Sequence, residues 1–360
     1  MPLFYPAKRS VFHMFYARVK KTHAERLRRL LARKSLLNGE GRIKHSISYV
    51  YFPVVNEDEK IKKLIHAAGA ELVGRKGREI KKRGSFADGV EKARRDSGTR
   101  MSAGYDVIGT IAIIDVGADI GAGRVRQLAK ELMEENSHVK TVLAKAGAVA
   151  GRYRIRGLRY VAGRRNFATV HRENGCSFYM DVRKTFFSPR LAYERARIAR
   201  LSKGKERVVV MFAGAGPFVV QIAKANGRAE VVGIELNRDS FSYMKRNIEL
   251  NRLKNARAVF GNVRTVSRRY RNIADRILMP LPMSSMDFLG DAFDVAKTRA
   301  VIHLYAFCSS DTLGKELIDR TIDLGRKRGI SITLIGKRVV RPYSSKELEM
   351  AFDLLVRKKR

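Results

Sequence analysis

The sequence predicts an α/β protein whose main domain is an open, doubly wound parallel sheet. From Val208 onward, apolar runs rich in β-branched residues alternate with helical segments, as expected of parallel strands joined by helices. The first of these strands ends in a glycine turn at Gly214 and Gly216, and the next strand ends in Glu235. The preceding segments read as a small α+β domain and a basic region. The expected domains are therefore residues 1–103, 104–186 and 187–360.

The sheet domain is expected to open with a helix and then alternate regularly. Ser188 and Pro189 form an N-cap followed by proline at the first helical position, and Gly204 ends this helix. The expected strands lie near 208–214, 230–235, 257–261, 275–281 and 300–306, the helices near 217–227, 238–251, 284–297 and 311–328, and two final strands at Ser331–Ile335 and Leu348–Val356.

The small domain is expected to begin with one strand from Tyr105 to Asp115. A helix near 122–135 and a strand near 138–145 follow. Asn174-Gly175 between two alternating segments, 168–173 and 176–182, predicts a β-hairpin.

The N-terminal region is expected to hold a basic helix and a strand. Residues 12–37 are rich in Lys and Arg and end at Asn38-Gly39, which predicts a helix and its C-terminal signal. Residues 47–54 alternate and predict a strand. The polar, glycine-rich stretch 74–104 is expected to be a linker, or a loop that RNA orders.

The glycine turn and the strand-end acid predict an adenosine-containing cofactor. Gly214 and Gly216 let a ligand approach the backbone, and the N-terminus of the following helix attracts anionic groups. Glu235 is placed to accept the two hydroxyls of a ribose. A dinucleotide fingerprint would carry a third glycine where Val219 stands, and no Walker motif is present. S-adenosylmethionine (AdoMet) is therefore the expected cofactor, and a ligand-free strand–helix turn is the alternative.

Composition favours an anionic polymer as partner. The net charge is +39, from 74 Lys and Arg against 35 Asp and Glu, and such a potential favours phosphate neutralisation on nucleic acid. Only Cys176 and Cys308 are present, so no disulfide framework or cysteine-based metal site is expected. No apolar run reaches the roughly 20 residues of a membrane span, and we expect a cytoplasmic, monomeric protein without metal or membrane contact.

Several motifs together resemble the archaeal and eukaryotic tRNA (guanine-37 N1)-methyltransferase family. They are His-Arg-Glu-Asn-Gly-Cys at 171–176, Phe-Ser-Pro-Arg-Leu at 187–191, Phe-Ala-Gly-Ala-Gly-Pro-Phe at 212–218, Leu-Pro at 281–282 and Ile-His-Leu-Tyr at 302–305. The resemblance extends roughly from Tyr105 to Val356. It implies a Rossmann-like class I AdoMet-dependent methyltransferase sheet and tRNA as partner, bound at the anticodon stem-loop and, through the N-terminal region, at the outer corner.

The resemblance also implies roles for individual residues. Arg154 matches the arginine that donates to guanine O6, Glu194 the proposed general base, and Arg190 a supporting residue. The matched cofactor-binding positions are Phe212, Gly214, Gly216, Glu235, Asn262 and Pro280. The chemistry asks for such groups independently, because guanine N1 must lose a proton to a base while negative charge builds on O6. The i,i+4 spacing of Arg190 and Glu194 further predicts that they pair on one helix face.

Three positions depart from the family pattern. Val210 stands where relatives often have an acid, Asn262 replaces the usual aspartate near the adenine amino group, and Pro280 replaces the asparagine of Asn-Leu-Pro. The amide oxygen of Asn262 can still accept a hydrogen bond. For Pro280, we expect the backbone carbonyl of Met279 or of Pro280 itself to substitute.

Two other functions remain open from the sequence. The sister enzyme of wybutosine synthesis, which transfers an aminocarboxypropyl group from AdoMet, would share the sheet and the tRNA. A tRNA-binding homologue without catalysis is the second alternative. A dehydrogenase is disfavoured by Val219 and by the lack of a recognisable His–acid pair, and we assign His171 and His303 to core support.

Overall fold

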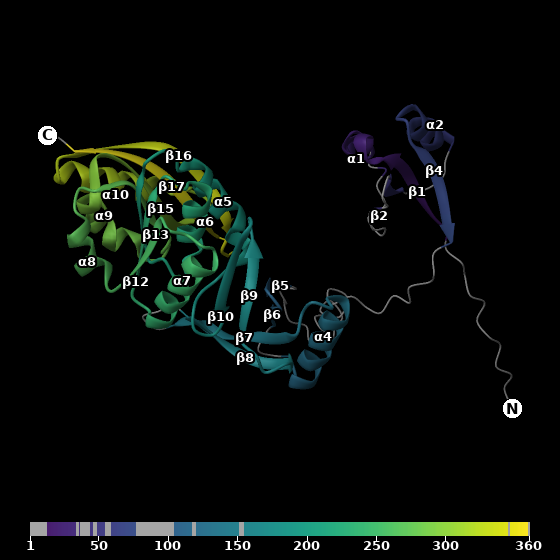
Figure 1. The fold of residues 1–360 in the computed structure, drawn as a ribbon, viewed down its shortest axis with the longest axis horizontal. Helices are drawn as coiled ribbons and strands as arrows, with labels where there is room; N and C mark the ends of the chain where they lie inside the picture. The colour runs from purple at the N-terminus through teal and green to yellow at the C-terminus, as the bar shows by residue number, and fades with distance from the viewer. Residues whose placement is uncertain are drawn as a thin grey trace. The chain divides into compact units, whose positions relative to one another are not determined.

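The computed structural model describes residues 13–33, 36, 44–45, 49–54, 59–76, 104–116, 120–150, 155–344 and 346–358. It separates into two compact units at residues 83 and 84. Figure 1 draws both, and each is described by itself.

The first unit is a small antiparallel sheet with two helices. Its elements are β1 (His13–Lys20), the 3-10 turn η1 (Lys21–His23), α1 (Ala24–Arg33), β2 (Lys44–His45), β3 (Tyr49–Val54), α2 (Glu59–Ala67) and β4 (Glu71–Lys76). The strand order is β2-β3-β1-β4. Leu27 and Leu31 of α1 and Ile65 of α2 pack in its core.

The helix predicted for residues 12–37 is wrong in its first half, which forms β1. Ala17 and Val19 are buried while Arg18 and Lys20 point outward, so this segment has the two-residue period of a strand. The strand predicted near 47–54 is confirmed as β3. Residues 74–76 of the expected linker belong to β4, and 77–103 lie outside the described residues.

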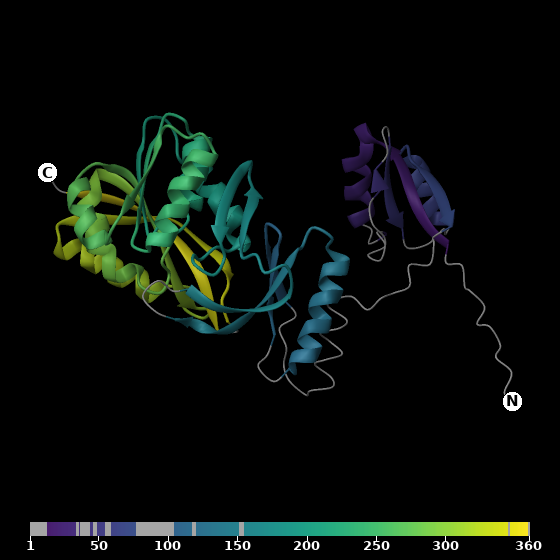
Figure 2. The same cartoon turned by 60° about the horizontal axis from the view of Figure 1, so that its bottom comes forward.

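The second unit begins with a four-stranded sheet covered by one helix. Its elements are β5 (Gly104–Ile108), β6 (Ile111–Asp115), α4 (Ala122–Glu135), β7 (Thr141–Ala150) and β8 (Ile155–Gly163), in the order β5-β6-β7-β8. The single strand predicted from 105 to 115 is a hairpin, because Gly109 has φ +57° and turns the chain back. Figure 2 shows α4 along this sheet, where Leu128 and Leu132 pack against Ile114 and Val142.

The predicted Asn-Gly hairpin is confirmed as β9 (Ala168–Glu173) and β10 (Cys176–Asp181). Asn174 and Gly175 have φ +47° and +73°, as a type I′ turn requires. The free edge of β10 is covered by side chains from the main sheet domain: Asn247 and Asn251 accept from the amides of Tyr179 and Ser177 at 2.7 and 3.0 Å. The hairpin is thereby fixed to that domain.

The main sheet has seven strands in the order β13-β12-β11-β14-β15-β17-β16. They are β11 (Arg207–Met211), β12 (Glu230–Glu235), β13 (Ala256–Phe260), β14 (Ala274–Met279), β15 (Ala296–Ser309), β16 (Ile330–Pro342) and β17 (Glu347–Lys358). β17 runs antiparallel to both of its neighbours. All seven strands expected after residue 207 are present, and the predicted doubly wound sheet is confirmed.

Helices cover both faces of this sheet (Figure 1). They are η2 (Pro189–Leu191), α5 (Ala192–Leu201), α6 (Pro217–Ala225), α7 (Arg238–Leu250), α8 (Val263–Val266), η3 (Ser267–Tyr270), η4 (Ser285–Phe288), α9 (Leu289–Val295) and α10 (Lys315–Lys327). One core holds residues of α5, α6 and α7, and the other holds residues of α8, α9 and α10. β11 is flanked by β12 on one side and β14 on the other, so the topological switch point lies at its carboxyl end, where such sheets bind ligands.

Candidate active site

The glycine turn after β11 is built from left-handed backbone. Phe212, Gly214 and Gly216 have φ +56°, +58° and +81°. A Cβ on Gly216 would lie 2.7 Å from Met244 Cγ, so only glycine fits there. A Cβ on Gly214 would meet nothing closer than the Phe186 carbonyl oxygen at 3.9 Å. Gly214 thus faces open space where a ligand can approach the backbone, and Pro217 begins α6 as predicted.

Val219 stands where a dinucleotide-binding motif would have its third glycine. The side chain of Val219 fits because the facing residue on β12 is itself a glycine. A Cβ on Gly233 would lie 2.7 Å from Val219 Cγ2 and 2.5 Å from Met244 Sδ. The close approach of helix and strand is therefore achieved by a glycine on the strand rather than on the helix. This packing is consistent with the exclusion of a dinucleotide fingerprint.

Glu235 ends β12 directly opposite the glycine turn. Its carboxylate accepts from the Gly214 amide and the Asn237 amide, both at 2.7 Å. Burial raises the pKa of Glu235, although these backbone hydrogen bonds act in the other direction. A carboxylate has about four acceptor positions, so it can hold the turn and still accept a ribose hydroxyl.

Asn262 follows β13 and caps α8. Its side-chain oxygen accepts from the Arg264 amide at 3.0 Å, which leaves one lone pair of this oxygen for the predicted hydrogen bond near the adenine amino group. Phe260, at the end of the same strand, is 44% exposed and packs on Phe241 with ring centroids 5.5 Å apart. Sequence reasoning missed this apolar surface, although an aromatic residue just before Gly261 at a strand end was a usable signal.

Pro280 follows β14, whose last residue is Met279. The Met279 carbonyl accepts from the Leu281 amide and from the Ser285 hydroxyl, both at 2.9 Å. Two internal donors fill its lone pairs, so Met279 does not fit the predicted role of substitute acceptor. The Pro280 carbonyl remains the candidate.

The predicted pair of Arg190 and Glu194 is wrong. Arg190 lies in the 3-10 turn η2, and its Nε donates to Asp106 Oδ1 on β5 at 2.6 Å. Glu194 lies in α5, is fully buried, and accepts instead from Arg197 and Tyr305. The i,i+4 argument assumes one continuous α-helix from residue 189, whereas α5 begins only at Ala192.

Ser188 contributes a buried polar atom without a partner. Its side chain is buried, and its Oγ is one of two such side-chain atoms that lack a hydrogen bond within the described part of the chain. Buried hydroxyls are normally satisfied. Because the carbonyl of nearby Phe186 faces Gly214, Ser188 belongs to the segment that passes over the glycine turn. An unsatisfied donor at this place fits a site that receives a polar ligand.

Arg154 and the neighbouring arginine-rich stretch 151–154 lie outside the described residues. His171 Nδ1 accepts from the Gly109 amide at 3.2 Å, and the buried His303 of β15 lies 2.6 Å from Asp353 Oδ1, a His–acid pair that the sequence did not indicate. Among the helices of the described segments, none is long and apolar enough to cross a membrane.

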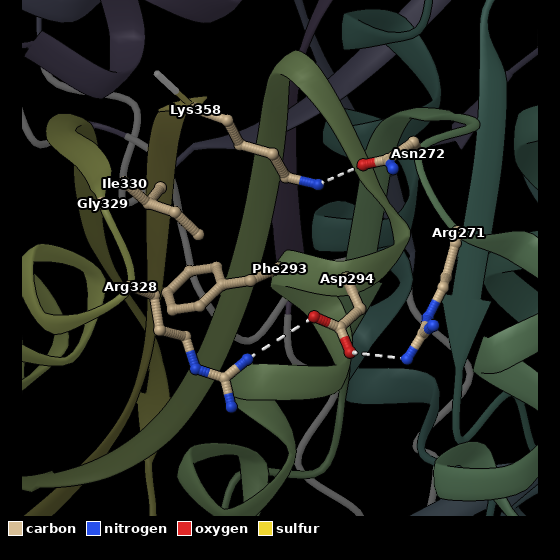
Figure 3. A pocket seen from close by; sticks show the side chains of 8 residues that line it. All are labelled: Arg271, Asn272, Phe293, Asp294, Arg328, Gly329, Ile330 and Lys358. Atoms are coloured by element: carbon tan, nitrogen blue, oxygen red, sulfur yellow. Dashed lines mark hydrogen bonds and ion pairs between the residues drawn. The ribbon is translucent and has the colours of Figure 1, made fainter. Parts of the chain in front are cut away.

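A hollow lies at the other end of the main-sheet strands, away from the glycine turn (Figure 3). Arg271 and Arg328 approach Asp294 at 3.9 and 3.5 Å, and Lys358 donates to Asn272 at 2.5 Å. These residues stand at the amino ends of β14 and β15. Because ligands of such sheets bind at the carboxyl ends, we place the candidate site at the glycine turn and not here.

Comparison with known proteins identifies the relatives of this chain. A family model described as the TRM5/TYW2 methyltransferase domain matches residues 169–333, and one described as the tRNA methyltransferase 5 N-terminal domain matches residues 18–62. The tRNA (guanine(37)-N(1))-methyltransferase Trm5b of Methanocaldococcus jannaschii is 32% identical over 348 residues, or 95% of this chain and 98% of that protein.

Solved structures agree with this relationship. The complex of aTrm5 and tRNALeu has a TM-score of 0.66 at 29% identity and covers 95% of this chain and 99% of its own. TYW2 of M. jannaschii in complex with AdoMet has a TM-score of 0.57 at 25% identity, covering 71% of this chain and 100% of its own.

The fold and the site define a class I methyltransferase that uses AdoMet, which confirms the predicted fold class and cofactor. The chain belongs to the TRM5/TYW2 family of tRNA methyltransferases.

Proposed function

We propose that this protein methylates N1 of guanine 37 in tRNA. The observation that carries this choice within the family is the match of residues 18–62 to the tRNA methyltransferase 5 N-terminal domain, together with a guanine-37 relative that is similar over 95% of the chain. The tRNA complex of a solved relative supports tRNA as the partner. We further propose that the protein is a cytoplasmic monomer. Its N-terminal unit would contact the outer corner of tRNA.

The proposed chemistry requires residues that hold the donor and residues that prepare the base. Glu235 would bind the ribose, the turn at Gly214 and Gly216 would admit the ligand to the backbone, and Phe212, Asn262 and Pro280 would complete this side. When bound, AdoMet supplies an activated methyl group. Glu194 would accept the proton of guanine N1 while Arg154 stabilises negative charge on O6, and Arg190 would support them.

The product distinguishes this proposal from the sister enzyme. Purified protein is incubated with unmodified tRNA transcript and AdoMet labelled either in the methyl group or in the carboxyl carbon. We expect only the methyl label to enter RNA. Carboxyl label in RNA would indicate aminocarboxypropyl transfer instead, and tRNA binding without transfer of either label would indicate a non-catalytic homologue.

The orphan hydroxyl of Ser188 gives a sharp prediction. Ser188→Ala should lower kcat/KM by roughly tenfold, the effect of losing one hydrogen bond to a ligand. The melting temperature should stay the same or rise, since the hydroxyl has no partner to lose in the free protein. The matched control is Ser285→Ala, which removes a buried hydroxyl bonded to Met279 and Leu281 and should lower the melting temperature. Unchanged kinetics in Ser188→Ala would remove Ser188 from the site.

A surface of stacked arginines and aromatic rings is suited to bind the RNA. It comprises Tyr160, Arg165, Phe167, Tyr179, Arg183, Tyr243 and Arg246. The guanidinium groups lie 4.9 Å from the Tyr160 ring centre, 3.7 Å from Phe167 and 3.5 Å from Tyr179, respectively. The arginines are exposed and the rings are half-buried. Such a surface offers cations to phosphates and ring faces to bases.

This arginine–aromatic surface is continuous with the candidate active site. Arg183 is followed by Lys184, whose carbonyl accepts from the Asn237 side chain at 2.9 Å. Asn237 lies two residues beyond Glu235, and the backbone carbonyl oxygen of Phe186 lies close to Gly214. An RNA strand bound along this surface would therefore reach the glycine turn.

Charge removal on this surface should weaken tRNA binding. Arg183→Gln and Arg246→Gln are each expected to raise the Kd for tRNA, and each lost phosphate contact should reduce the salt slope of log K by about 1. The Kd for AdoMet should not change. Arg271→Gln and Arg328→Gln, in the hollow at the other end of the strands, are the matched controls and should bind tRNA like the wild type. Equal losses in both pairs would contradict a local RNA surface.

A further inference from the structure

The carboxylate of Glu194 is held by three hydrogen bonds in the core between α5 and the main sheet. Oε1 accepts from the Tyr305 hydroxyl and from an Arg197 terminal nitrogen, both at 2.7 Å, and Oε2 accepts from Arg197 Nε at 2.8 Å. Glu194 has no exposed surface. The two oxygens are thus unequal: Oε1 has two donors and Oε2 has one.

A second layer fixes Arg197. Its remaining terminal nitrogen donates to Asp353 Oδ2 on β17 at 2.6 Å, and His303 Nδ1 lies 2.6 Å from Asp353 Oδ1. Arg276 lies 2.7 Å from His303 Nε2. Because arginine only donates, Nε2 must accept, so His303 is neutral and its proton on Nδ1 points to Asp353.

The alternating motif Ile-His-Leu-Tyr explains how β15 supplies both layers. His303 and Tyr305 lie on the face toward Glu194, whereas Ile302 and Leu304 pack in the core on the other face. The motif is a strand that carries two polar partners for α5 at a two-residue spacing.

Burying these charged groups between α5 and the main sheet costs desolvation free energy. Three carboxylates, Glu194, Asp353 and Glu206, lie with two arginines, Arg197 and Arg276, where apolar side chains of similar volume are often equally or more stabilising. With all five charged, the sum is −1, and one proton on a carboxylate makes it neutral. A largely buried cluster with one unit of excess negative charge is suited to accept a proton.

We infer that Tyr305 and Arg197 are positioning residues for Glu194, with Asp353 and His303 as their anchors. This inference rests on the proposed function. Two donors occupy Oε1, so the remaining acceptor position of Oε2 takes the proton from guanine N1. The N1–H bond breaks, an O–H bond forms at Oε2, and the electron pair stays on guanine.

The test compares two tyrosine-to-phenylalanine variants. Tyr305→Phe removes one donor and keeps the ring, and we expect kcat to fall roughly tenfold to a hundredfold with the KM values unchanged. The other charged or titratable groups of this network, Arg197, His303, Asp353, Arg276 and Glu206, stay in place.

Tyr270→Phe is the matched control. Tyr270 is also buried and its hydroxyl accepts from Arg257 at 3.1 Å, away from Glu194, so kcat should equal that of the wild type. Arg197→Lys is the second variant in case Tyr305→Phe does not fold, and it should also lower kcat with the KM values unchanged.

A wild-type kcat in folded Tyr305→Phe or Arg197→Lys, with Glu194→Gln inactive, would overturn the inference and leave the proposed function standing. Full activity of Glu194→Gln would overturn the assignment of the base itself.

Discussion

Replacing Glu194 with glutamine is expected to lower kcat by about 10²- to 10⁴-fold, the usual contribution of a general base. The amide keeps the volume and can still accept at its oxygen, but it cannot take the N1 proton. AdoMet binding should be unchanged, because Glu194 contacts Arg197 and Tyr305 and not the glycine turn. Single-turnover methylation at saturating tRNA, with calorimetric titration of AdoMet, measures both quantities.

Glu173→Gln is the matched control for this variant. Glu173 is also buried and bonded to an arginine, with Arg195 Nε at 2.5 Å from its carboxylate, and its substitution should affect stability more than turnover. If Glu194→Gln turned over as fast as the wild type, Glu194 would be a structural ion-pair partner only.

Glu235→Ala is expected to weaken AdoMet binding by roughly tenfold to a hundredfold. The change removes the proposed acceptor for the ribose and also leaves the amides of Gly214 and Asn237 without their carboxylate. Charge-assisted hydrogen bonds of this kind are about twice as strong as neutral ones. Calorimetry of AdoMet binding at fixed pH measures the loss, and the Kd for tRNA should stay close to its wild-type value.

The control lies on the same strand. Glu230 is the first residue of β12, at the opposite end of this strand from Glu235, and it pairs with Arg207 at 3.1 Å on the surface. Glu230→Ala should therefore leave AdoMet affinity unchanged. Equal affinities of Glu235→Ala and Glu230→Ala would exclude Glu235 from the cofactor site.

The sheet domain could be predicted because its signals are local. β-branched runs, Pro217 after Gly216, and Glu235 at a strand end each act within a few residues, and the seven strands followed. The helix prediction for residues 13–20 is wrong because it rests on their content of basic residues. It overlooks the two-residue period of a strand in this segment. The predicted strand 105–115 has Gly109 in its interior. The positive φ of Gly109 instead allows the turn that separates β5 from β6.

The surroundings of Glu194 could not be predicted for a different reason. Arg197 meets Asp353 across 156 positions of sequence, and Tyr305 meets Glu194 across 111. No local hydrophobic periodicity or sequence motif predicts such long-range contacts. The predicted partner Arg190 was wrong because Arg190 lies within the 3-10 turn η2, before α5 begins at Ala192.

We expect this chain to form 1-methylguanosine at position 37 of tRNA, and nucleoside mass spectrometry detects that product. Purified protein is incubated with AdoMet and an unmodified transcript that carries guanine 37, beside a transcript with adenine at that position. We expect 1-methylguanosine, mapped to position 37, from the first transcript and none from the second. Absence of this nucleoside from both, or its equal formation in the second transcript, would contradict the account.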